Sequence, residues 1–199
     1  SEDGSGVLAV DLGADGGKGG TMLIRSMGSM GEPSPTNDPE IHRLHFEGQA
    51  VFKIAVQGIS ASANRVLDRA GLTADDVDLV VPHQANARII DSATRRLGID
   101  EDRVFVNIGN LGNTAAASIP MAISDALDAG RVSPGDTVVL TAFGGGVTWG
   151  SIALTWGDRT KPVGVHEGEL PPTDMTCFDL LQDNLDFFAP LHADDLPIP

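Results

Sequence analysis

Apolar residues along most of this chain fall into two kinds of pattern. Short runs rich in valine, isoleucine and leucine, bounded by glycine, proline or charged residues, are typical of buried strands. Residues 49–70 instead place apolar side chains three and four positions apart, which predicts an amphipathic helix, and Gly71 follows as a helix stop. Strands are predicted at 7–12, 41–46, 77–81, 104–106, 137–142 and 147–156, and helices at 49–70, about 85–97 and 114–129.

The order of these elements indicates an α/β fold. From the strand at 41–46 to the third helix, strands and helices alternate, and right-handed crossovers between such strands produce a largely parallel sheet with helices on its faces. The last two strands are joined only by the glycine turn 144–146, so we expect them to form an antiparallel pair at one edge of a mixed sheet. Pro120 lies within the third predicted helix and is expected to kink it or move its start.

Composition changes after about residue 158. The 199-residue chain is 41% hydrophobic, which suffices for one core, but residues 158–199 are rich in proline, aspartate and glutamate and poor in basic residues. Two interpretations are open for this acidic tail: a surface segment that docks one short helix, or a dedicated partner-binding helix. The large apolar residues of that possible helix are spaced three, four and three apart, at Phe178, Leu181, Leu185 and Phe188.

Charge and cysteine content narrow the classes of partner. The chain has 13 Lys and Arg against 28 Asp and Glu, a formal net charge of -15, which argues against nucleic-acid binding because phosphate neutralisation needs clustered cations. We expect no membrane span, because no run of eighteen apolar residues occurs and the first residues do not resemble a signal peptide. A cytoplasmic, reducing location fits the single cysteine, Cys177, which rules out an internal disulfide.

Three loops at the ends of predicted strands are candidates for chemistry: 82–86, 109–114 and 143–146. A neutral histidine and an asparagine amide can both donate hydrogen bonds to one carbonyl oxygen, and a glycine turn can offer a backbone N–H to an oxyanion. Each feature also has a simpler explanation. His83 suits the start of a helix, Asn113 suits a helix cap, and consecutive glycines suit a tight turn.

Taken together, the motifs in these loops resemble the ketoacyl-acyl-carrier-protein synthase III family. The resemblance covers about residues 7–156, and the motifs occur in the family's order and at its separations. They are His-Gln-Ala-Asn-Ala-Arg-Ile-Ile at 83–90, Gly-Asn-Thr-Ala-Ala-Ala-Ser-Ile-Pro at 112–120 and Ala-Phe-Gly-Gly-Gly-Val-Thr-Trp-Gly-Ser at 142–151, with further matches at 12–16 and 48–53.

This resemblance implies the second half of a thiolase-like fold, with layered αβα architecture and a mixed, mainly parallel sheet. It also implies decarboxylative Claisen condensation of an acyl-coenzyme A starter with malonyl-carrier protein, with no cofactor beyond the coenzyme A thioester that serves as substrate. The residues that match family positions are His83 and Asn113 for decarboxylation, Gly145 for the oxyanion hole, Gly48 and Phe52 for the pantetheine tunnel, and Lys53 and Arg88 for the tunnel mouth that meets acyl carrier protein or coenzyme A.

The sequence departs from the family in one large respect. The family's first half, which carries the cysteine nucleophile, has no counterpart here, and Cys177 lies in the tail without the glycine elbow and buried helix that a nucleophile needs. We therefore expect residues 1–40 to be the last strand of that first half plus a connecting loop, 41–157 the second half, and 158–199 the tail. We also expect a cysteine-bearing N-terminal chain to pair with this one, through cleavage of a precursor or as a separate subunit, and the complete enzyme to be a dimer.

Other functions remain open beside condensation. One is a synthase III-like acyltransferase of natural-product biosynthesis that does not decarboxylate, and another is a non-catalytic companion subunit that binds a partner through the acidic tail. The presence of both His83 and Asn113 favours condensation. A metal site is disfavoured because His42 and His45 point to opposite faces of a predicted strand, and a nucleotide site because residues 144–146 precede a strand instead of a helix.

Overall fold

The computed structural model describes residues 5–25 and 43–162, together with residues 164, 176, 179 and 182. The chain divides into two compact units, Ser1–Val163 and Gly164–Pro199, and the fold and site set out below belong to the first unit. The four apolar residues of the predicted tail helix, together with Cys177, lie outside the described residues. That predicted helix therefore stays a prediction.

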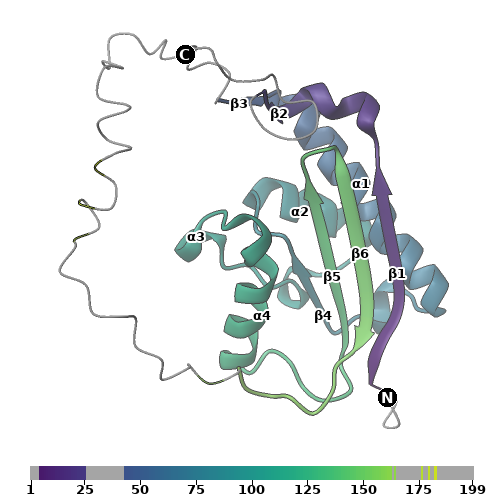
Figure 1. The fold of residues 1–199 in the computed structure, drawn as a ribbon. Helices are drawn as coiled ribbons and strands as arrows, with labels where there is room; N and C mark the ends of the chain where they lie inside the picture. The colour runs from purple at the N-terminus through teal and green to yellow at the C-terminus, as the bar shows by residue number, and fades with distance from the viewer. Residues whose placement is uncertain are drawn as a thin grey trace. The chain divides into compact units, whose positions relative to one another are not determined.

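A four-stranded sheet organises the first unit (Figure 1). Its spatial order is β1 (Gly6–Ala14), β6 (Thr148–Thr155), β5 (Thr137–Gly144) and β4 (Leu79–Pro82). β4 and β5 pair in parallel, whereas β6 is antiparallel to both β5 and β1. Three of the strands thus run in one direction and β6 alone runs against them.

The predicted position of the antiparallel strand is wrong. We expected the last two strands to form an antiparallel edge, but β6 lies inside the sheet, between β5 and β1. The short turn after Gly144 folds β6 directly back along β5, and β1 then pairs with the side of β6 that remains free. β1 therefore shares a sheet with the strands expected for residues 41–157, while its assignment to one half of a longer protein stays a prediction.

The predicted strand at 104–106 is also reduced, to a single parallel bridge between Val104 and Val80. The backbone N–H groups of Asn107 and Ile108 bind the side chain of Gln84, and the chain turns there into the short helix α3 (Ile108–Leu111). A strand cannot continue where its amides are directed to a side chain in this way.

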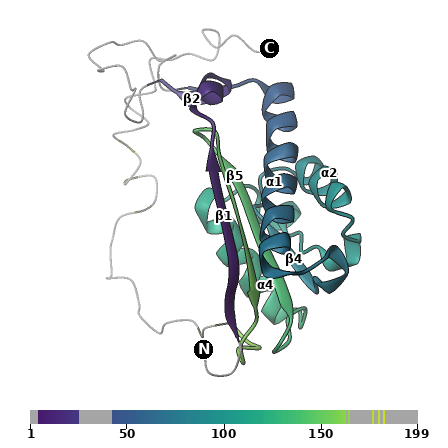
Figure 2. The same cartoon turned by 90° about the vertical axis from the view of Figure 1, so that its right-hand side faces the viewer.

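Helices cover both faces of the sheet, as the αβα layering requires (Figure 2). α1 (Gly48–Ala70) and α2 (Ala87–Leu97) pack on one face, and α4 (Ser118–Asp128) packs on the other, against β4. The alternation of side chains along the strands produces this division. Val80, Val139 and Ala153 belong to the core under α1 and α2, and Leu79, Val81 and Val138 to the core under α4.

The ends of the helices follow local signals. α1 and α2 end at Gly71 and Gly98, whose φ angles of 70° and 74° are left-handed, as the sequence predicted. α2 begins at Ala87 because the Asn86 side chain accepts a hydrogen bond from the N–H of Arg88 at 2.9 Å. α4 begins later than predicted: residues 115–117 form a 3-10 turn, and Pro120 falls in the first helical turn, where its missing N–H costs nothing.

Two short strands form a second sheet that the sequence only half predicted. β2 (Met22–Ile24) pairs antiparallel with β3 (Leu44–Phe46), which is the described end of the strand expected at 41–46. β2 falls in a stretch that we expected to be a loop, and three residues are too few for an alternating pattern to be visible. Further 3-10 turns lie at Gly16–Thr21, Ala74–Asp76 and Glu101–Arg103.

The carboxylate of Asp11 joins β1 to α1. Asp11 is 5% exposed, and its two oxygens accept hydrogen bonds from Nε and Nη2 of Arg65 at 2.9 and 2.7 Å and from the Ser62 hydroxyl at 2.8 Å. Arg69 Nη2 lies 3.1 Å from the same carboxylate. The hydrogen-bonded Arg65 guanidinium holds the pKa of Asp11 below its ordinary value.

Removing this carboxylate is expected to destabilise the chain. Asp11→Asn should lose about 2–4 kcal/mol of unfolding free energy near pH 7, because two guanidinium groups lose a bidentate, shielded acceptor. Because the pKa of Asp11 is lower in the folded chain than in the unfolded chain, its carboxylate stabilises the fold at pH values above the unfolded-state pKa. This stabilisation is lost as pH falls through the folded-state pKa. The difference in unfolding free energy between Asp11→Asn and wild type should therefore shrink below about pH 4.

Urea unfolding of both proteins across that pH range measures the effect. Asp91→Asn is the matched control, because Asp91 pairs with Arg95 at the surface, where the two side chains are 41% and 67% exposed. That control should change stability by less than about 1 kcal/mol. Equal losses of unfolding free energy in Asp11→Asn and Asp91→Asn would show that the Asp11 contacts stabilise the fold no more than a surface ion pair does.

β1 exposes apolar side chains that its sheet does not cover. Val7, Val10 and Leu12 are 63%, 42% and 78% exposed, on the face of the sheet opposite α1. Their strand partners on β6 continue the face that α4 covers, where α4 packs mainly against β4. A row of exposed apolar residues on an edge strand is a surface that other protein segments bind readily.

In the described ranges, no helix combines the length and apolar character needed to cross a bilayer.

Candidate active site

His83 lies at the predicted junction between a strand and a helix. Its backbone N–H donates to the carbonyl of Thr141 at 2.7 Å, which extends the parallel pairing of β4 and β5 by one residue. The ring is partly buried, and its Nδ1 atom lies 2.5 Å from the hydroxyl of Ser118. Burial lowers the pKa of His83 below its ordinary value of 6.5, because the charged ring loses hydration. The imidazole is therefore neutral near pH 7.

Gln84 ties the His83 turn to the chain that leads to Asn113. It is 1% exposed, and its Nε2 donates to the carbonyls of Pro82 and Phe105 at 2.8 and 3.1 Å. Its Oε1 accepts from the backbone N–H groups of Asn107 and Ile108 at 3.0 and 3.2 Å. Every donor and acceptor of the buried amide is used, so this side chain fixes the spacing of two loops.

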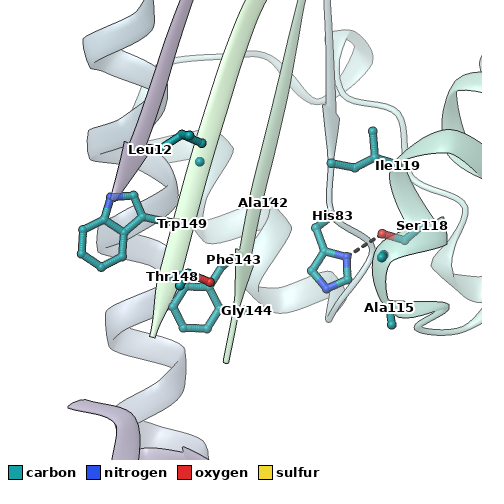
Figure 3. A pocket seen from close by; sticks show the side chains of 12 residues that line it. Leu12, His83, Ala115, Ser118, Ile119, Ala142, Phe143, Gly144, Thr148 and Trp149 are labelled. Atoms are coloured by element: carbon teal, nitrogen blue, oxygen red, sulfur yellow. Dashed lines mark hydrogen bonds between the residues drawn. The ribbon is translucent and has the colours of Figure 1, made fainter. Parts of the chain in front are cut away.

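The first and third predicted loops line one cavity of about 510 Å³, together with residues that directly follow the second loop (Figure 3). His83 comes from the first loop, Ala115 and Ser118 from the region after the second, and Phe143 and Gly144 from the third. Leu12 of β1 and Trp149 of β6 extend the wall. Apart from the histidine, every described residue that lines this cavity is uncharged, so the imidazole is the single ionisable group among them.

Asn113 lies near the cavity but is not one of the residues that line it. Its side chain is exposed, and Oδ1 accepts a hydrogen bond from the backbone N–H of Ala115 at 3.0 Å. This is a local turn at the start of the 3-10 segment, and the residue preceding α4 is Ala117, so Asn113 does not cap α4. The side-chain amide nitrogen remains available on the exposed side of this loop.

Gly145 lies in the turn between β5 and β6, next to Gly144 of the cavity wall. Its carbonyl accepts a hydrogen bond from the Thr148 hydroxyl at 3.2 Å. The φ angle that requires glycine belongs to the next residue, Gly146, at 140°. The simple expectation of a turn with positive φ thus holds at Gly146, and Gly145 lies between that residue and Gly144 of the cavity wall.

The predicted tunnel and mouth residues lie at the starts of two helices. Gly48, Phe52 and Lys53 are exposed in the first turns of α1, and Arg88 is exposed in the first turn of α2. The neighbouring residues Val51 and Ile89 belong to one apolar cluster with Phe143. The two helix starts therefore gather near the end of β5, although none of the four predicted residues lines the cavity.

Trp149 owes its place in the wall to two glycines. A Cβ atom on Gly13 of β1 would lie 2.3 Å from the indole Nε1, and one on Gly58 of α1 would lie 3.4 Å from the ring. The indole thus occupies space that any other residue at position 13 would fill. Trp149 had no predicted role, and only the pairing of β1 with β6 shows why glycine stands opposite it.

The layered sheet, with a histidine turn, an asparagine loop and a glycine turn grouped at one end, defines the second half of a thiolase-like fold. A family model described as 3-Oxoacyl-[acyl-carrier-protein (ACP)] synthase III C terminal matches residues 67–156. The chain belongs to this family and corresponds to its C-terminal half.

Individual relatives agree with this assignment. A beta-ketoacyl-[acyl-carrier-protein] synthase III from Vibrio cholerae is 46% identical over 68% of this chain and 38% of its own length. The crystal structure of 3-oxoacyl-[acyl-carrier-protein] synthase III from Aquifex aeolicus superposes with a TM-score of 0.69 at 38% identity, over 78% of this chain and 46% of that one. The priming beta-ketosynthase of the R1128 polyketide pathway gives 0.67 at 34% identity, over 78% and 46%. The chain spans half or less of the length of these proteins.

Two residues with clear positions in the site escaped the sequence analysis. Gln84 and Ser118 both stand inside the motifs that carried the resemblance, but neither was given a role. A glutamine in a loop is usually solvated, and a serine at a helix start usually caps that helix. Only the folded arrangement shows that each instead contacts the turn of His83.

Proposed function

We propose that this chain provides the decarboxylating half of a 3-oxoacyl-acyl-carrier-protein synthase III, which condenses an acyl-coenzyme A starter with malonyl-carrier protein. The observation that carries the proposal is His83: a neutral imidazole, held through Nδ1 by Ser118, in the wall of an otherwise uncharged cavity. A neutral hydrogen-bond donor in an apolar site suits the stabilisation of an oxyanion that forms only during reaction.

In this proposal the malonyl thioester carbonyl accepts hydrogen bonds from His83 Nε2 and from the Asn113 side-chain amide. The bond to the carboxylate breaks, carbon dioxide leaves, and the electron pair of that bond forms an enolate whose oxygen the two donors stabilise. The enolate carbon then attacks an acyl thioester on a cysteine, and the N–H of Gly145 helps to stabilise the resulting tetrahedral oxyanion. Collapse of this intermediate releases the cysteine thiolate and the 3-oxoacyl thioester.

The cysteine belongs, in this proposal, to the part of the family fold that lies outside the matched half of the relatives, whether on the same polypeptide or a separate one. The exposed apolar residues of β1 support contact with such a segment. We assign Gly48 and Phe52 to the pantetheine tunnel, and Lys53 and Arg88 to its mouth, where basic groups attract coenzyme A or the acidic carrier protein. We further propose a cytoplasmic dimer of the complete enzyme that uses the coenzyme A thioester as substrate and no other cofactor.

Reconstitution with a cysteine-bearing half tests this function. Malonyl-carrier protein labelled at the free carboxylate is supplied with an acyl-coenzyme A, and labelled carbon dioxide and the 3-oxoacyl product are measured together. The proposal expects both in equal amounts with the intact pair, and carbon dioxide alone when the partner's cysteine is replaced by alanine. Acyl transfer without carbon dioxide would identify an acyltransferase instead, and a stable complex with neither product would identify a companion subunit.

The pathway is the finer question within this proposal. The likeness to a priming beta-ketosynthase of a polyketide pathway favours a starter for a specialised product as the second candidate. Comparing acetyl-coenzyme A with branched and longer acyl-coenzyme A starters in the same assay separates this candidate from fatty-acid initiation.

A further inference from the structure

The Ser118 hydroxyl lies between two nitrogen atoms of the turn that carries His83. Its Oγ atom is 2.5 Å from Nδ1 of the imidazole and 3.2 Å from the backbone nitrogen of Gln84. Ser118 is 2% exposed and is the first residue of α4, so the helix holds it in place. Figure 3 shows its hydroxyl directed at the imidazole beside the cavity.

The two contacts of this hydroxyl differ in what the nitrogen atoms can do. The Gln84 backbone N–H can only donate, so it occupies a lone pair of Oγ. A ring nitrogen of neutral histidine can donate or accept. If Nδ1 donated as well, the hydroxyl hydrogen would need another acceptor, and Oγ has no third partner in residues 5–25 and 43–162. A buried hydrogen without an acceptor is costly, and Oγ therefore donates to Nδ1.

We propose that Ser118 is a positioning residue that holds His83 as the tautomer with its proton on Nε2. Since Nδ1 accepts, the hydrogen of the neutral ring resides on the other nitrogen, on a ring that lines the cavity. That nitrogen is the one able to donate to a thioester carbonyl. The inference rests on the proposed function only for the use of this proton, because the tautomer follows from contacts within the chain.

The same geometry disfavours the protonated ring. An Nδ1–H would occupy the second lone pair of Oγ, because the Gln84 N–H already occupies the first, and the hydroxyl hydrogen of Ser118 would then have no acceptor within residues 5–25 and 43–162. The residues that line the cavity with His83 include no carboxylate that could stabilise an imidazolium. Loss of the Ser118 hydroxyl is therefore expected to mix the two neutral tautomers and to raise the pKa of His83.

Nitrogen-15 NMR of the histidine-labelled full chain tests the tautomer directly. The His83 signals are assigned by their absence in His83→Gln. Wild type should show one neutral form, protonated at Nε2 and bare at Nδ1. Ser118→Ala should show averaged ring nitrogens and a raised pKa, and kcat of the reconstituted enzyme should fall about tenfold with little change in KM.

Ser60→Ala is the matched control, because Ser60 is also 2% exposed on a helix but bonds only to backbone carbonyls of α1. It should leave the His83 signals unchanged, and Ser118→Thr should restore them if the hydroxyl is what matters. A wild-type ring protonated at Nδ1 would overturn the proposal, and so would Ser118→Ala signals that match those of Ser60→Ala. If Ser118→Ala does not fold, the wild-type spectrum still decides. A confirmed tautomer without decarboxylation would reject the proposed function and leave this inference standing.

Discussion

Replacing His83 by alanine is expected to lower the rate of malonyl-carrier-protein decarboxylation by about 10²–10⁴-fold in the reconstituted enzyme. Within residues 5–25 and 43–162, the imidazole is the only ionisable group that lines the cavity, and alanine offers no donor to the enolate oxygen. Because the donor is needed mainly in the transition state, kcat should fall far more than KM rises. Release of labelled carbon dioxide under single-turnover conditions measures this step apart from product release.

The pH dependence of the same step follows from the lowered pKa of His83. The ring works as a neutral donor, so wild-type decarboxylation should persist below pH 6.5 and fall only as pH drops through the lowered value. His83→Gln retains an amide donor that does not titrate. This variant should keep part of the decarboxylation rate, and that rate should not fall at acidic pH through titration of this residue. A His83→Ala enzyme with wild-type decarboxylation would contradict the assignment.

Replacing Gln84 by leucine is expected to destabilise the chain by about 3 kcal/mol or more. The change leaves two backbone N–H groups and two carbonyls without their buried partner, at about 1–3 kcal/mol for each group that water cannot reach. Activity should fall further than stability explains, because the loops of His83 and Asn113 lose their connection. Urea unfolding followed by circular dichroism measures the free energy.

Two further variants distinguish the loss of the Gln84 hydrogen bonds from a general effect of replacing a glutamine. Gln57→Leu changes an exposed glutamine on α1 and should stay within about 0.5 kcal/mol of wild type. Gln84→Glu keeps an oxygen for the N–H groups of Asn107 and Ile108 but cannot donate to the carbonyls of Pro82 and Phe105, so it should also destabilise the fold. Stability of Gln84→Leu equal to that of Gln57→Leu would show that solvent reaches those backbone groups.

Much of the fold could be predicted because local signals are strong where helices begin and end. The glycines after α1 and α2 stand where left-handed caps are needed, and the apolar spacing of residues 49–70 produced nearly the observed helix. The meeting of the first and third loops could also be predicted, since they follow β4 and β5, two parallel strands that end at the same side of the sheet.

Pairing between distant strands could not be predicted in the same way. Nothing in the residues of β6 indicates whether its second edge will pair with β1 or face solvent, because β1 lies far from β6 in the sequence and the pairing forms only in the folded chain. The roles of Gln84 and Ser118 were hidden for a related reason: their partners are backbone atoms and a ring brought near by folding. The exposed position of Asn113 likewise depends on the turn it forms with Ala115.

The place of β6 between β1 and β5 has a consequence for synthesis on the ribosome. β1 is made well before its partner β6, which is the last strand of the sheet, so Val10 has to wait for Ile152. At about 5–20 residues per second that interval is roughly 7–30 s, during which β1 lacks its β6 partner. A nascent chain with so late a closing contact is an expected client for chaperones, and slower translation is expected to increase that demand.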